Sequence, residues 1–250
     1  MANWNETERT RQGLGSVPRA GRQAGVAYDE GLRSYMLSIY NYMTSGVLLT
    51  GIVALLFSWG GQSSMAAQVF LNGGILPWVI QLAPLAFILV MSFGMQRISK
   101  PMLNVLFWAF ATTMGLSLST IFLVYTGESI ALTFFATAGA FAGLSLFGYT
   151  TKKDLSAFGT FLVMGVIGLI IASVLNLFLQ SGVLSFVISA VGVLVFAGLT
   201  AYDTQRLKEQ YAYIRGTELM GKAIIMGALN LYLDFINMFL FLLRFLGSEE

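Results

Sequence analysis

The stretch IIMGALNLYLDFINMFLFLLRFL, residues 224–246, is apolar over a length that crosses a bilayer, yet it carries an aspartate near its centre. A span needs about 20 apolar residues to cross a hydrocarbon core of about 30 Å. Asp234 is the sole acidic residue of this stretch, and an ionisable group at membrane depth costs at least about 2.5–3.5 kcal/mol on insertion scales. Such a group normally faces a protein interior or a watery path, so we expect a partner for Asp234 elsewhere in the chain.

The composition as a whole is that of an integral membrane protein. Hydrophobic residues make up 56% of the 250 residues, charged residues make up 10%, and the mean hydropathy is +0.75, whereas a soluble domain carries roughly 25% charged residues. The lipid bilayer is therefore the main partner, and no nucleic-acid partner is expected. The chain has no cysteine, which excludes disulfides, and no histidine. Since histidine is the side chain that ordinarily titrates near neutrality, a pH response there requires a perturbed Asp, Glu or Lys.

Seven apolar runs predict an all-α, polytopic membrane protein with seven transmembrane helices. The connections between the runs are too short to form a soluble domain, so residues 34–250 are predicted to form one seven-helix bundle. Residues 1–33 are rich in Arg, Gly, Asn and Glu and are predicted to be a mostly disordered tail. The seven runs are residues 36–59, 77–95, 102–125, 129–149, 158–179, 183–202 and 224–246.

The basic residues predict the orientation of these spans. They lie in the tail and in the connections after the second, fourth and sixth spans, while the other three connections hold none. Because cytoplasmic loops collect Lys and Arg, the N-terminus is predicted to be cytoplasmic and the C-terminus outside. Arg244, at the far end of the seventh span, is the one basic residue outside this pattern. The others are Arg9, Arg11, Arg19, Arg22, Arg33, Arg97, Lys100, Lys152, Lys153, Arg206, Lys208, Arg215 and Lys222.

Small residues recur within the spans at spacings that let helix backbones approach closely. Gly139 and Gly143 are spaced as GxxxG, and Gly192 and Gly198 lie in the sixth span. We expect these glycines to be helix-packing sites.

Asp203 is the natural partner of Asp234, because it directly follows the sixth apolar run in the segment LTAYDTQRLK. The two predicted depths differ, however. Counting along the spans places Asp203 at the inner edge of the membrane and Asp234 roughly 15 Å from that face, at about 1.5 Å per residue. The pair therefore requires either a tilted or displaced seventh span, or water that enters a cytoplasmic vestibule. An alternative for Asp203 is a simple boundary charge beside Arg206.

One face of the seventh span is polar. Gly227, Asn230, Asp234 and Asn237 recur at steps of three and four residues, which places them on the same side of a helix. Polar atoms facing lipid would lack partners, so this face is predicted to point into the bundle and to make the seventh span a central helix. In the alternative interpretation, Asp234 is a structural hydrogen-bonding residue and the two asparagines are local stabilising groups.

The two carboxyl groups would be chemically coupled if they meet. One proton shared between Asp203 and Asp234 would close the pair with a hydrogen bond, and loss of that proton would introduce repulsion. A chain without histidine can sense pH in this way. The deprotonated pair also offers hard oxygen ligands of the kind that Ca²⁺ accepts, although two carboxylates alone make only a weak site.

Three segments resemble the Bax inhibitor family of seven-span membrane proteins, in its bacterial branch. They are GLRSYMLSIYNYMTSGVLLTG (residues 31–51), GLTAYDTQRLK (residues 198–208) and LNLYLDFINMFLFLLRFLG (residues 229–247). The resemblance implies a seventh helix surrounded by the other six, a pH-dependent calcium leak, and a bacterial inner (plasma) membrane location. It also implies a di-aspartyl pH sensor, which falls on Asp203 and Asp234. Family members have an Arg on the second helix that latches to the sixth-helix Asp, and Arg97 is the best candidate here, although it also fits a topology-setting loop residue.

The function predicted on these grounds is a pH-sensitive Ca²⁺ leak channel, not an enzyme, with Ca²⁺ as the transported ion and no further cofactor. One alternative is a non-conducting regulator that binds a membrane protease or another membrane protein. A second is an intramembrane aspartyl protease, a class that also has a Tyr-Asp on its sixth helix and an Asp on its seventh. The second Asp of that class follows a GxGD pattern and a later Pro-Ala-Leu element is expected, whereas this chain has LYLD and no proline after Pro101.

Overall fold

The computed structural model describes residues 19–248, and the side chains from residue 29 onward. Within that range it contains eight α-helices, two short 3-10 helices and no strand. The helices are α1 (Arg19–Phe57), η1 (Gly61–Ser63), α2 (Met65–Leu71), α3 (Leu76–Gly94), α4 (Lys100–Leu118), η2 (Ser119–Leu123), α5 (Gly127–Thr150), α6 (Ser156–Leu179), α7 (Gly182–Ile214) and α8 (Leu219–Leu246).

Seven of these helices are long and apolar enough to span a membrane, which confirms the predicted fold class. The eighth, α2, is a seven-residue helix in the connection between the first two spans, and its N-cap Ser64 accepts a hydrogen bond from the N–H of Ala67. Hydropathy did not predict α2 because seven residues are too few to cross a bilayer. The protein is thus a multi-pass, all-α membrane protein.

Two helices extend well beyond their apolar runs. Helix α7 continues to Ile214, twelve residues past the predicted end at residue 202, so Asp203 lies within a continuous helix. Helix α1 begins at Arg19, so residues 19–33 of the predicted disordered tail are helical and continuous with the first span. The rest of that tail, residues 1–18, lies outside the described residues. Hydropathy marks where a helix is apolar, whereas the helix itself persists as long as its residues form helix well.

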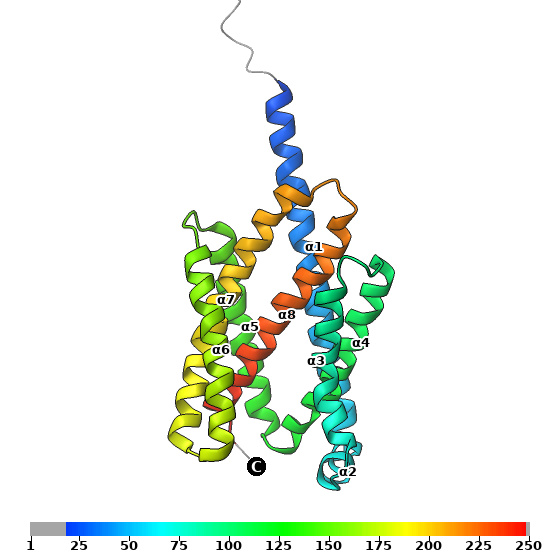
Figure 1. Ribbon diagram of the computed structural model, residues 1–250, viewed down its shortest axis with the longest axis vertical. Coiled ribbons are helices and arrows are strands. Elements are labelled where there is room, and N and C mark those ends of the chain that lie inside the picture. The colour runs from blue at the N-terminus through cyan, green and yellow to red at the C-terminus, as the bar shows by residue number, and fades with distance from the viewer. Residues whose placement is uncertain (1–18, 249–250) are drawn as a thin grey trace, which may run out of the picture.

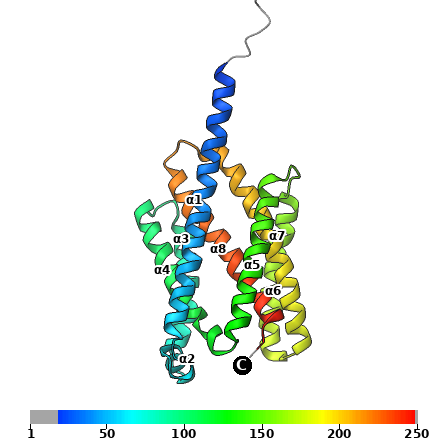
Figure 2. The same cartoon turned by 180° about the vertical axis from the view of Figure 1, so that it is seen from behind.

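The spans form two groups with α8 running obliquely between them (Figures 1 and 2). On one side α3 packs on α4, which packs on α1; on the other side α5 and α6 both pack on α7. Helix α8 contacts α1 and α4 in the first group and α5 and α7 in the second. The main partners of α3 and α6 are instead α4 and α7, so the prediction that six helices surround α8 is not confirmed.

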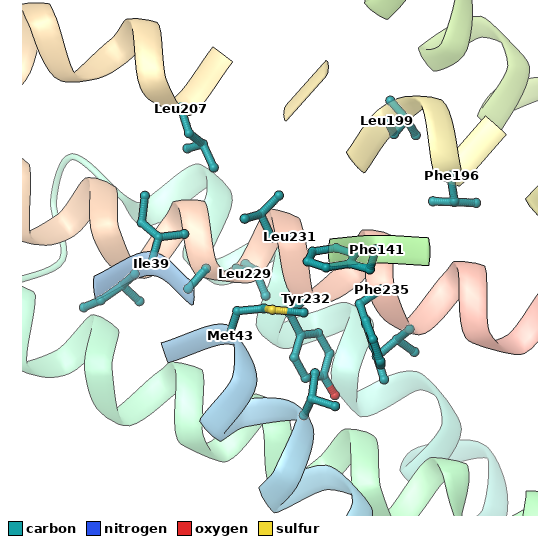
Figure 3. Packing of buried hydrophobic residues seen from close by; sticks show 14 of the residues in the cluster. Ile39, Met43, Phe141, Phe196, Leu199, Leu207, Leu229, Leu231, Tyr232 and Phe235 are labelled. Carbon is teal, nitrogen blue, oxygen red and sulfur yellow. The ribbon is translucent and has the colours of Figure 1, made fainter. Parts of the chain in front are cut away.

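Burial distinguishes α8 from the other spans. In its most apolar window 61% of the residues are buried, against 11–39% in the other six. Figure 3 shows why: the ring of Tyr232 points from α8 toward α1, where Met43 lies beside it, while Phe141 of α5 and Leu199 of α7 lie on the other side of α8.

A buried hydrogen-bonded group ties α8 to the first helix group. The hydroxyl of Thr50 on α1 donates to the carbonyl oxygen of Ala111 on α4 over 2.8 Å, and it lies 2.6 Å from the hydroxyl of Tyr232. Since the Thr50 proton is committed to Ala111, the Tyr232 hydroxyl is the donor between these two. The three residues therefore fix the register of α1, α4 and α8.

The predicted glycine packing sites divide into two kinds. A Cβ placed on Gly192 would lie 2.5 Å from the ring of Phe241, and one on Gly198 would lie 2.8 Å from Leu162, so close packing at these positions is confirmed. A Cβ on Gly139 or Gly143 would meet no atom within 4 Å among the described residues, so packing of this GxxxG pair against another helix of the same chain is not confirmed. The motif sets a helix face of small residues but does not say whether another helix covers that face.

The connections that carry basic residues lie together at one end of the bundle. The α3–α4, α5–α6 and α7–α8 connections are at the end where α1 begins, and the C-terminus is at the opposite end (Figure 1). This is the alternation that the seven-span interpretation requires.

Candidate functional site

Asp203 of α7 and Asp234 of α8 interact directly through their carboxyl groups. Asp234 is buried, with 5% of its surface exposed, while Asp203 is half-buried. No hydrogen-bond donor from residues 19–248 reaches Oδ2 of Asp234. Because a carboxylate can only accept hydrogen bonds, a proton on one member of the pair is the donor that this arrangement lacks.

Helix lengths remove most of the predicted difference in depth between the two aspartates. Asp203 lies 11 residues before the end of α7 and Asp234 lies 15 residues after the start of α8. At about 1.5 Å per residue these distances are about 16 Å and 22 Å, which differ by about one helical turn. The early start of α8 at Leu219 and its oblique course (Figure 1) bring the carboxyl groups together. The contact between the two aspartates required either a tilted or displaced seventh span or a water-filled vestibule. The structure meets the first of these conditions.

Both aspartates line a cavity of about 940 Å³ between α6, α7 and α8. The cavity extends from the carboxyl pair toward the C-terminal end of α8, where Tyr125 and Arg244 line it, and not toward the basic connections. The cavity thus lies on the opposite side of the pair from the cytoplasmic vestibule that was the alternative condition for their contact. On α8 the lining runs from Asn230 to Arg244, which is about 21 Å along the helix at 1.5 Å per residue. Polar groups also line it, namely Ser173, Asn176, Ser185, Asn230 and Asn237.

The two asparagines of the predicted polar face lie on the wall of this cavity with Asp234. The side-chain amide of Asn237 donates to the carbonyl oxygen of Leu233, one turn earlier on the same helix, over 2.8 Å. Its amide oxygen is the group left to face the cavity. The fourth member of the face, Gly227, is buried, and a Cβ there would lie 2.8 Å from Leu207 of α7. This face of α8 therefore changes from close packing on α7 to a polar cavity wall at Asn230.

The proposed latch residue Arg97 is exposed in the turn between α3 and α4. Its side chain has no hydrogen bond or ion pair with any residue in the described part of the chain, so the structure does not bring it to Asp203. The cation that acts on Asp203 is Arg206, three residues further along α7. Residues i and i+3 share a helix face, so the motif AYDTQR carries its own counter-ion.

Sequence reasoning missed most of the cavity. Ser173 and Asn176 lie three residues apart in the most apolar span, whose mean hydropathy is 2.6, and that contrast is a usable signal. Asn176 also accepts a hydrogen bond from the N–H of Ser181 over 3.1 Å, which caps the end of α6. Arg244 lies seven residues after Asn237, on the same face of α8, so extending the polar face by two turns could have found it. The contribution of Tyr125 follows only from the three-dimensional packing.

Comparison with known proteins agrees with this architecture. The family model described as "Inhibitor of apoptosis-promoting Bax1" matches residues 32–250. The chain is 47% identical over 224 residues to an uncharacterized protein of Rickettsia prowazekii, covering 89% of this chain and 93% of that one. It is also 47% identical to the inner membrane protein YbhL of Escherichia coli over 224 residues, which are 88% of this chain and 94% of YbhL. An uncharacterized protein of Caulobacter vibrioides is 46% identical over 236 residues, or 91% of this chain and 94% of the relative.

The match runs through α1 to α8, and it includes both aspartates and the cavity that they line. This seven-span protein with a carboxyl pair between its last two helices is a member of the Bax inhibitor family.

Proposed function

We propose that the protein is a pH-gated cation leak that favours Ca²⁺, and that the Asp203–Asp234 pair is its proton sensor. The observation that carries the proposal is the direct pairing of two carboxyl groups on the wall of a polar cavity inside a membrane bundle. A buried acidic pair is costly to retain for stability alone, since ionisable groups at membrane depth are expensive and are typical of ion and proton pathways.

Protonation acts on the contact between α7 and α8. With one shared proton the carboxyl groups are hydrogen-bonded and hold α8 against α7. When the proton leaves, the two carboxylates repel each other; for unit charges at about 4 Å and an effective dielectric constant of about 20, the repulsion is roughly 4 kcal/mol. A free energy of that size changes a two-state equilibrium by several hundredfold, which is enough to alter how α8 is seated.

The chemistry of the site suits a hard cation that passes through. Ca²⁺ takes six to eight oxygen ligands, and within residues 19–248 no third acidic side chain joins the pair. The two carboxylates would supply the charge, while the side-chain oxygens of Asn230 and Asn237 and water would complete the shell. Binding of this kind is weak, as conduction requires.

The proposed location is the inner membrane of a bacterium, with the N-terminus in the cytoplasm and the C-terminus outside. The grouping of the basic connections at the N-terminal end (Figure 1) supports this orientation through the preference of cytoplasmic loops for Lys and Arg. In that orientation the cavity lies on the outer side of the carboxyl pair.

The decisive experiment is Ca²⁺ flux into proteoliposomes between pH 5 and 8. It compares the wild type with Asp203→Asn and Asp234→Asn, which keep the shape of the side chain but cannot ionise. We expect each variant to lose the pH dependence of the flux. Asp154→Asn is the matched control, because Asp154 lies in the exposed α5–α6 connection, where its carboxylate accepts the Ser156 N–H over 2.8 Å.

The proposal fails if both pair variants keep the flux and the pH profile of the wild type. Arg97 is tested separately by the charge reversal Arg97→Glu. A latch role predicts a changed open fraction, and an effect confined to expression or orientation contradicts it.

A further inference from the structure

A second cavity lies on the other face of the bundle, between α1 and α5. These helices stand side by side in Figure 2, with α8 passing behind them, and they are not among the described helix pairs that pack closely. The space between them is about 900 Å³ and is lined mainly by apolar side chains, with Phe235 of α8 at its back. Met43 of α1 and Phe141 of α5 form part of its walls. We call this space the α1–α5 groove.

One polar group inside the groove has no partner. Ser145 of α5 is 6% exposed, and its Oγ forms no hydrogen bond with any described residue. Two other hydroxyl residues of the same helix behave differently: Thr137 and Thr150 donate to the carbonyl oxygens four residues earlier, over 2.8 Å and 2.7 Å. A buried donor without an acceptor is destabilising, so a ligand with an acceptor oxygen at this depth fits the groove.

Charged residues line only the end of the groove nearest the basic connections. Asp29 and Arg33 lie one turn apart on α1 and both line it. On the opposite wall lies Tyr149 of α5. Its carbonyl oxygen accepts a hydrogen bond from Lys208 of α7 over 2.7 Å, and the Lys208 ammonium lies 5.2 Å from the centre of its ring. The mouth thus presents an anion and a cation one helical turn apart, with the cation of Lys208 behind the Tyr149 wall.

The remaining part of the space between α1 and α5 has a different lining. A neighbouring cavity of about 440 Å³ continues between α1 and α5 and shares Val47, Phe134 and Phe235 with the groove, but its lining contains no charged residue. A ligand that needs both an apolar channel and a charged mouth therefore fits only the half on the side of the basic connections.

The α5 side of the groove is about as long as one leaflet, and its α1 side is longer by about one helical turn. Its lining on α1 runs from Asp29 to Leu48 and on α5 from Phe134 to Tyr149, which are about 28 Å and 22 Å at 1.5 Å per residue. One leaflet with its headgroups is about 20–22 Å thick. Depth, polarity and position together select a membrane lipid that enters from the bilayer.

We propose that the α1–α5 groove binds a glycerophospholipid with a zwitterionic aminoethyl phosphate headgroup. Arg33 binds the phosphate, and Asp29 accepts hydrogen bonds from the primary ammonium group. Ser145 donates to an ester oxygen of the glycerol unit, and an acyl chain lies along Phe141 and Phe235. A choline headgroup has the same charges but no ammonium N–H, and a glycerol headgroup lacks the cation, so both should bind more weakly.

The test is native mass spectrometry of the full chain in detergent, with an equimolar mixture of phosphatidylethanolamine, phosphatidylcholine and phosphatidylglycerol of identical chains, plus the free fatty acid. We expect phosphatidylethanolamine to be retained preferentially. Ala142→Phe fills the groove and should reduce its retention at least fivefold. Ala140→Phe is the matched control, because Ala140 is exposed on the same helix and does not line the groove.

The headgroup contacts are tested by two further variants. Arg33→Gln should weaken binding of every phospholipid about tenfold, while Asp29→Asn should abolish the preference for the ethanolamine over the choline headgroup. Lys152→Gln, in the exposed α5–α6 connection, should change neither. Equal retention by Ala142→Phe and Ala140→Phe overturns the groove as the site. Equal retention of the three phospholipids by the wild type overturns the headgroup assignment, and preferential retention of the fatty acid overturns the phospholipid.

Discussion

Phe196 of α7 and Phe241 of α8 stack across the helix interface, with ring centroids 5.8 Å apart and planes 24° from parallel. Both rings line the cavity, and Phe241 lies seven residues, or about 10 Å, from Asp234 toward the C-terminal end. The two rings thus lie between the carboxyl pair and the C-terminal end of the cavity lining.

Removal of one ring from that stack should therefore increase conduction. In Phe241→Ala we expect the Ca²⁺ flux at a permissive pH to rise several-fold, because loss of the ring widens the cavity between the carboxyl pair and its C-terminal end. The measurement is flux into proteoliposomes at matched protein density. Phe245→Ala is the control: Phe245 pairs with Phe186 across the same two helices at 4.8 Å, but neither ring lines the cavity. An equal rise in both variants would contradict a role for the stack.

The hydrogen bond between Thr50 and Tyr232 should contribute measurably to stability. Tyr232→Phe removes the hydroxyl that donates to Thr50 over 2.6 Å, and we expect the free energy of unfolding to fall by about 0.5–1.5 kcal/mol. The four tryptophans of the chain provide a fluorescence signal for denaturant titration. Thr50→Val should cost more, since it also leaves the carbonyl oxygen of Ala111 without its donor. Strict additivity in the double variant would show that the two hydroxyls do not interact.

Glycine substitutions should have opposite effects in the two kinds of site. Gly192→Ala places a methyl group 2.5 Å from the ring of Phe241, and the overpacking should cost about 1–3 kcal/mol of unfolding free energy. Gly139→Ala meets no described atom within 4 Å and should stabilise the helix by up to about 1 kcal/mol. The measurement is the thermal unfolding midpoint of each variant. A lower midpoint for Gly139→Ala would indicate that this position contacts another chain.

Gln205 should hold the α5–α6 connection to α7. Its amide oxygen accepts from the N–H of Leu155 and its amide nitrogen donates to the carbonyl oxygen of Lys153, both over 2.8 Å. Gln205→Ala removes both hydrogen bonds, and the exposed backbone groups should exchange amide hydrogen faster at residues 151–156. Unchanged protection of that segment would mean that other contacts position it. The half of α7 that carries Asp203 is anchored at this point.

The pH response should not depend on Asp154. The side chain and the backbone N–H of Ser156 lower the pKa of the Asp154 carboxyl from its ordinary value of 3.8. A carboxyl group with a lowered pKa stabilises the folded state when the pH is above the ordinary pKa. This stabilisation is lost as the pH falls through the lowered pKa. Between pH 5 and 8 Asp154 therefore stays ionised, and Asp154→Asn should keep the midpoint of the flux profile. A shifted midpoint would indicate that Asp154, and not only the Asp203–Asp234 pair, sets the pH response.

The sequence predicted the number and type of spans well because each apolar run must satisfy the length of the bilayer. It also predicted the Asp203–Asp234 contact, since a lone charge in an apolar helix requires a partner. It did not predict that α7 continues to Ile214, because the residues after Asp203 are polar while hydropathy detects only the buried part of a helix. The direction of the cavity was missed because Asn176 and Arg244 lie on different helices that meet only in the folded bundle.

Asp234 and Phe235 are neighbours in the chain but belong to opposite faces of the protein, one on the cavity wall and the other at the back of the α1–α5 groove. Rotation or tilt of α8 moves both side chains together, because successive residues of a helix are rigidly joined. Thermodynamic linkage then makes the effect reciprocal: a lipid that favours one seating of α8 changes the proton affinity of the pair, and protonation changes lipid affinity by the same factor. Membrane composition and pH would thus both act on the position of α8.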